Sequence, residues 1–126
     1  MPRNTTTRDK NIYMFSQTGS SVEHLSGKYG LKPTTIKKII KKSENSISEK
    51  EEFIYNMEVY IRKNYSALTS TNIINSLKRY FSTRDILFIK EVKDTIKDII
   101  SKEKHVRGIG DKYINILSEY FKTLNL

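Results

Sequence analysis

The chain has 126 residues, and its 23 Lys and Arg against 14 Asp and Glu give a formal net charge of +9. It contains no cysteine, which excludes disulfides and thiolate metal sites. No apolar run approaches the roughly 20 residues that cross a bilayer, and the first residues lack the apolar core of a signal peptide, so we expect an intracellular protein with no membrane partner.

The positive charge is concentrated in the first third of the chain. Residues 1–42 hold 9 basic and 2 acidic side chains, residues 43–66 hold 3 and 5, and residues 67–126 hold 11 and 7. A phosphate-binding surface requires such a local excess. The alternative is that a lysine-rich composition merely solvates the surface.

The first 43 residues predict a flexible arm followed by three helices. After the polar residues 1–7, apolar residues from Arg8 onward recur at helical spacing until Gly19. Ser20 and Glu23 form a capping-box pattern, which predicts a second helix that ends at Gly30. A third helix is expected to begin at Pro33, with a buried stripe of Ile36, Ile39 and Ile40.

The remainder is also predicted to be helical. Residues 42–48 are expected to form a linker, and Ser48 with Glu51 repeats the capping-box pattern and predicts a helix to about Tyr65. Further helices are expected over residues 70–81, 83–89, 92–104 and, after the turn VRGIG, to the end of the chain. We therefore expect an all-α protein with an N-terminal unit (1–43), a linker and connecting helix (44–66) and a C-terminal domain (67–126).

The N-terminal pattern suits a helix-turn-helix unit that binds DNA. Gly30 suits the turn because glycine adopts positive φ without a steric penalty. The side chains expected to face outward from the third helix and its start are Lys32, Thr34, Thr35, Lys37, Lys38, Lys41 and Lys42. The threonines are placed to reach base edges or phosphate, the lysines suit phosphate, and Arg8 and Ser21 complete the set of candidate DNA contacts.

This segment resembles the helix-turn-helix of sigma factor region four, of resolvases and of Mor-type phage activators. The resemblance implies that residues 33–42 enter the major groove of double-stranded DNA. The alternative is a structural three-helix bundle with a solvated lysine face.

The C-terminal turn VRGIG, residues 106–110, followed by Lys112, is typical of a helix-hairpin-helix. Glycines in such a turn let the backbone approach a phosphate, and the amides at the start of the next helix attract anions. With the upstream sequence LTSTNIINSLKRYFSTRDIL and the terminal helix, the segment resembles the C-terminal domain of the RNA polymerase α subunit. That resemblance implies minor-groove binding and contact with transcription activators.

The family pattern is matched only in part. Asn75, Gly110 and Lys112 match its DNA-contacting positions, whereas Asn72 stands in place of the arginine inserted into the minor groove and Tyr113 in place of a serine. The candidate site residues of this domain are Asn75, Arg107, Gly108, Gly110 and Lys112. The alternative is a domain that serves only for packing or for docking a protein.

The sequence thus predicts a non-enzymatic, sequence-selective DNA-binding regulator of transcription, encoded by a phage or plasmid and acting in the cytoplasm of a bacterial cell or phage-infected host. We expect no cofactor and no metal, because His24 and His105 lie far apart and no acidic cluster is evident. The alternatives are a module that binds host RNA polymerase, and an accessory protein of plasmid replication, partition or recombination. Homodimerisation through the aromatic residues of helix 48–65 is a further expectation left open.

Overall fold

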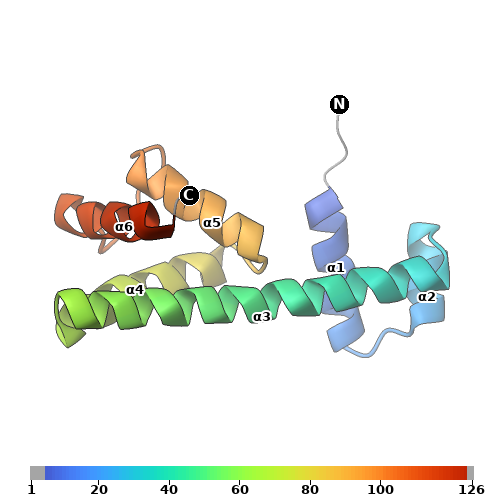
Figure 1. Cartoon of the computed structure of the whole chain (residues 1–126). Helices are drawn as coiled ribbons and strands as arrows, with labels where there is room; N and C mark the ends of the chain where they lie inside the picture. The colour runs from blue at the N-terminus through green and yellow to red at the C-terminus, as the bar shows by residue number, and fades with distance from the viewer. Residues whose placement is uncertain (1–4, 125–126) are drawn as a thin grey trace. The chain divides into compact units, whose positions relative to one another are not determined.

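A computed structural model describes residues 5–124 of the chain, and the side chains from residue 7 onward. The described part contains six helices and no strand, so the all-α expectation is confirmed (Figure 1). The chain divides into two compact units between Ser48 and Glu49. Among the described residues, no helix combines the length and the apolar character that crossing a membrane requires.

The first unit contains α1 (Thr5–Gln17), α2 (Val22–Tyr29) and the beginning of α3 (Pro33–Asn64). Its core is formed by Ile12 from α1, Leu25 from α2, and Ile36 and Ile39 from α3. These are the apolar positions that recur at helical spacing in the sequence. The expected flexible arm is helical from Thr5, and residues 1–4 lie outside the described residues.

The cap of α2 lies one residue later than the sequence pattern predicts. Ser21, not Ser20, is the N-cap, and its Oγ accepts a hydrogen bond of 3.1 Å from the backbone N–H of His24. The backbone N–H of Ser20 instead donates to the carbonyl of Phe15 at the end of α1. Ser20 therefore belongs to the turn that closes α1, and the residue after it caps α2.

The expected linker at residues 42–48 is wrong, because α3 runs without interruption from Pro33 to Asn64. Ser43 is 4% exposed and Ile47 is half-buried, so the buried positions continue at helical spacing after Ile36 and Ile39. The apolar periodicity of the sequence does not show this continuation, because the buried position 43 is occupied by a serine. The capping box expected at Ser48 is likewise absent, since this residue lies inside the helix.

The second unit consists of the later part of α3 together with α4 (Ala67–Thr83), α5 (Ile89–Ile100) and α6 (Asp111–Leu124). One apolar core joins all four, with Ile61, Leu77, Ile96 and Leu117 each fully buried. This core positions the hairpin between α5 and α6.

Helix boundaries in the second unit differ from the sequence expectations, and α4 extends beyond the expected 70–81 at both ends. Residues 84–88 form a loop, not part of a helix: Asp85 has a φ of 51°, and the backbone N–H of Ile86 donates to the carbonyl of Phe81. Helix α5 then begins at Ile89 and ends at Ile100, three to four residues earlier at each end than the expected 92–104. Side-chain capping explains the start, because Glu91 accepts the backbone N–H of Phe88 at 3.2 Å.

Candidate nucleic-acid interface

The turn between α2 and α3 is fixed by hydrogen bonds to one serine. Gly30 adopts φ 65° and ψ 31°, and the backbone N–H groups of Gly30 and Leu31 both donate to the carbonyl of Ser26. The Ser26 hydroxyl in turn donates to the carbonyl of Leu31. The left-handed glycine confirms the expected turn residue, and these bonds set the direction in which α3 leaves the turn.

The orientation of α3 about its own axis is set by its buried side. Ile36 and Ile39 belong to the core of the first unit, and Ser43 is buried on the same side of the helix. Six of the seven side chains predicted to face outward are exposed: Lys32, just before the helix, and Thr34, Lys37, Lys38, Lys41 and Lys42 on it. The seventh, Thr35, is half-buried.

Four of these lysines meet in one place. Lys37, Lys38, Lys41 and Lys42, together with Asn45, line a shallow hollow of about 390 Å³ on the exposed side of α3. Within the described part of the chain, none of the four forms a salt bridge with a carboxylate. In the second unit, by contrast, Asp111, Asp98 and Glu119 each pair with a lysine.

This arrangement costs helix stability in the free protein. Lys37 and Lys41, and likewise Lys38 and Lys42, are like charges separated by four residues. Each such pair destabilises a helix by roughly 0.2–0.5 kcal/mol. A polyanion bound along this face would remove the repulsion and gain the attraction, so the geometry is suited to a row of phosphates.

The two remaining candidates of the first unit already make internal contacts. The guanidinium of Arg8 donates two hydrogen bonds to the carboxylate of the neighbouring Asp9, at 3.0 and 3.1 Å. Ser21 caps α2 and is exposed. Any contact of theirs with a nucleic acid would have to coexist with these structural roles.

The hairpin of the second unit spans residues 106–110. Val106 and Ile109 are buried, and the backbone N–H of Ile109 donates to the carbonyl of Val106. Gly108 has a φ of 93°, and a Cβ atom added there would lie 2.5 Å from the Oγ of Ser76 on α4. This glycine is therefore required for packing against α4, whether or not a phosphate approaches it.

The neighbouring residues leave more room for a ligand. A Cβ atom on Gly110 would meet nothing within 4 Å, and Arg107 and Lys112 are exposed. Asn75, on α4, is exposed as well. However, Asp111 places a carboxylate in the first turn of α6 and pairs with Lys102 at 3.4 Å, which reduces the attraction of this helix end for an anion.

The two departures from the α-subunit pattern lie together. The side-chain amide of Asn72 donates to the hydroxyl of Tyr113 at 3.3 Å. The positions where that family carries a minor-groove arginine and a serine are thus occupied here by a contact between α4 and α6.

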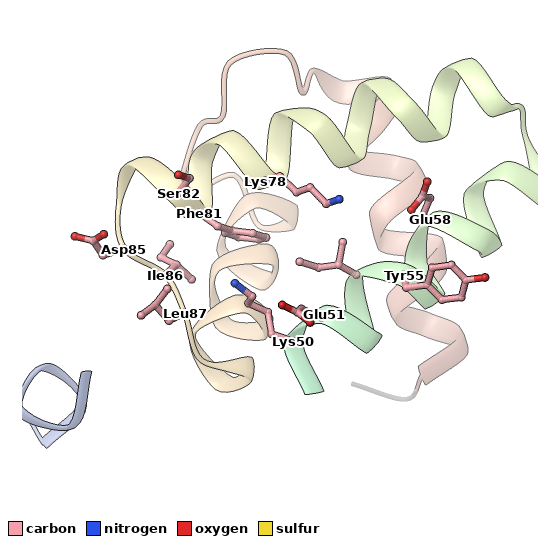
Figure 2. A pocket seen from close by; sticks show the side chains of 11 residues that line it. Lys50, Glu51, Tyr55, Glu58, Lys78, Phe81, Ser82, Asp85, Ile86 and Leu87 are labelled. Carbon is pink, nitrogen blue, oxygen red and sulfur yellow. The ribbon is translucent and has the colours of Figure 1, made fainter. Parts of the chain in front are cut away.

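A separate groove lies in the second unit between the later part of α3, the end of α4 and the loop that follows (Figure 2). It has a volume of about 570 Å³ and an apolar floor that includes Ile54, Phe81 and Ile86. Its rim carries charges of both signs, from Lys50, Glu51, Glu58, Lys78 and Asp85. Tyr55 stands at its edge and is 61% exposed.

The aromatic residues of the middle helix divide between core and surface. Phe53 packs edge-on against Tyr120 and Phe121, with ring centroids 6.2 and 6.0 Å apart, and Tyr60 contacts Tyr120 at 5.0 Å. Burial raises the pKa of the Tyr120 hydroxyl above its ordinary value. Tyr55 and Tyr65 remain exposed, so only part of this aromatic set is available to a partner.

Asn45 also lines the hollow but is absent from the sequence-predicted contacts, because it fell in the expected linker. If the helix continues through Ser43, the position of Asn45 four residues after Lys41 places it on the same face.

Within residues 5–124, no group of three or more His, Cys, Asp or Glu side chains is placed to hold a metal ion. Comparison with known proteins gives no match to a protein family, to a curated protein or to a solved structure.

Proposed function

We propose that this protein binds double-stranded DNA through the lysine face of α3 and regulates transcription from the sites it selects. The observation that carries the proposal is the group of four lysines that line one hollow without carboxylate partners. The turn at Gly30 and the exposed position of α3 support a helix-turn-helix arrangement, in which the second helix of the pair lies in the major groove.

The proposed role of the second unit is to add backbone contacts. Arg107, Gly110 and Lys112 are the residues with room for a phosphate, and Asn75 is exposed on α4. We assign them a smaller share of the binding, since the carboxylate of Asp111 stands beside them.

A salt titration tests the proposal. Binding of a labelled random-sequence duplex is measured by fluorescence anisotropy between 50 and 200 mM salt. If Lys32 and the four lysines of the hollow each neutralise one phosphate, the logarithm of affinity should fall with the logarithm of salt with a slope of about −4.5, a loss of roughly 500-fold over this range. An affinity that hardly changes with salt would contradict the proposal.

One control and two further measurements extend this test. A duplex RNA of the same sequence should bind less tightly, because the major groove of A-form RNA is too narrow to admit a helix. Selection of bound fragments from random DNA then reports the motif, and a palindromic motif would indicate the dimer. Run-off transcription from a template that carries the motif tests regulation itself.

The groove of the second unit favours the alternative that this unit binds RNA polymerase. An apolar floor with a rim of mixed charge is suited to a protein surface more than to a phosphate backbone. Purified polymerase should then be retained by the protein after nuclease treatment, and Tyr55→Ala should weaken retention. Loss of the association on nuclease treatment would contradict this alternative.

A further inference from the structure

The continuity of α3 brings an amide into the lysine face. Asn45 lines the same hollow as Lys37, Lys38, Lys41 and Lys42. Its side chain is exposed, and it makes no hydrogen bond within the described part of the chain. Its donor and acceptor groups are therefore both available to a ligand.

Helical geometry places Asn45 on the midline of that face. Thr34, Lys38, Lys41 and Asn45 follow one another at steps of four, three and four residues, which aligns them in a single row along the helix. At about 1.5 Å per residue the row is about 16 Å long, or roughly five base pairs at about 3.4 Å each. It lies opposite the buried residues Ile36 and Ser43, so it is the part of α3 that would reach deepest into a groove.

Asn45 differs chemically from the rest of this row. A lysine offers only donors and a threonine offers one hydroxyl, whereas a side-chain amide offers a donor and an acceptor side by side. That pair matches the N7 acceptor and the N6 donor that adenine presents in the major groove. We propose that Asn45 reads an adenine there, an inference that rests on the DNA-binding function proposed above.

The expected discrimination is measurable. A bidentate contact of this kind favours the correct base by about 5- to 150-fold. The lysines around it, which position the helix on phosphates, would contribute affinity without comparable sequence preference.

The test is selection from random duplex DNA with the wild-type protein, Asn45→Ala and Asn45→Asp. Asn56→Ala is the matched control, because Asn56 is also an exposed asparagine of α3 but lies in the second unit. We expect the alanine variant to lose an adenine preference at one position while the rest of the motif and the salt slope are retained. The aspartate variant, which offers only acceptors, should favour cytosine at that position.

The result is not confounded by unfolding. Alanine is the better helix former, so Asn45→Ala should leave helicity by circular dichroism equal or higher. An unchanged motif in Asn45→Ala, or the same change in Asn56→Ala, would overturn the assignment of Asn45 while leaving DNA binding intact. A wild-type protein that selects no motif and shows no salt-dependent binding would overturn the proposed function and this inference with it.

Discussion

Removing Lys37 and Lys42 together should change binding and stability in opposite directions. In the double variant Lys37→Ala with Lys42→Ala, two of the five proposed phosphate contacts disappear, so the salt slope should fall from about −4.5 to about −2.7. Between 50 and 200 mM salt the affinity would then drop about 40-fold, compared with about 500-fold for the wild-type protein.

Stability should move the other way. Lys37 repels Lys41, and Lys42 repels Lys38, across one helical turn. Abolishing both pairs should stabilise the helix by about 0.4–1 kcal/mol. Urea denaturation measures this gain, and fluorescence anisotropy measures the slope.

The matched control is Lys90→Ala with Lys97→Ala, since both lysines are exposed on α5 and carry the same total charge. Its slope should stay close to that of the wild-type protein. An equal reduction in the control would show that net charge, rather than the α3 face, governs binding. An unchanged slope in the α3 variant would refute the reasoning directly.

Three further predictions concern the second unit. Gly108→Ala should destabilise the protein by about 2–4 kcal/mol in urea denaturation, because the alanine would adopt a strained positive φ and its Cβ would clash with Ser76. Adding Ser76→Ala should recover about half of the lost stability. No recovery would contradict the clash. Gly110 directly precedes α6, and a Cβ atom has room there, so Gly110→Ser should cap this helix and leave stability unchanged or higher. A reduced DNA affinity of this variant would reveal a close phosphate approach, and an unchanged affinity would contradict one. Burial raises the pKa of Tyr120, so the contribution of this residue to the free energy of unfolding should be complete below pH ~10, the ordinary pKa of tyrosine, and should fall above it. Denaturation at pH 9–11 should therefore show a smaller loss of stability in Tyr120→Phe than in the wild-type protein. An equal loss in both proteins would contradict this origin.

The buried face of the first unit could be predicted from the sequence because its apolar residues are strong signals. Ile12, Leu25, Ile36 and Ile39 recur at helical spacing, and all four form the core. Gly30 was equally predictable, since a glycine directly after an apolar period is typical of a left-handed helix end.

The continuity of α3 could not be predicted in the same way. Ser43, Asn45, Ser46 and Ser48 are weak helix formers and favoured at caps, so local preference indicates a break. The helix persists because packing overrides local preference: Ser43 is buried, and no glycine or proline interrupts the segment. Asn45 was left out of the candidate contacts for the same reason, since it lies beside the four lysines only if the helix continues.

A similar limit applies to Gly108. A glycine in a hairpin is compatible with a close phosphate and with a close side chain, and the sequence does not distinguish the two. The position of Ser76 on α4 shows a packing requirement, and this is a contact between residues 32 positions apart in the chain. Such contacts depend on how the helices meet, which periodicity alone does not specify.

If α3 binds DNA as proposed, the length of this helix gives the second unit a part in that binding that requires no contact of its own with DNA. The cationic portion of this helix packs into the first core through Ile36 and Ile39, but it is weakened by its own like charges. The same helix continues through Ile54, Met57 and Ile61, which are buried in the core of the second unit. Because helix nucleation is costly and propagation is not, this anchored half supports the lysine-bearing half through the shared backbone. Weakening the second core should therefore reduce DNA affinity even where no phosphate contact is lost.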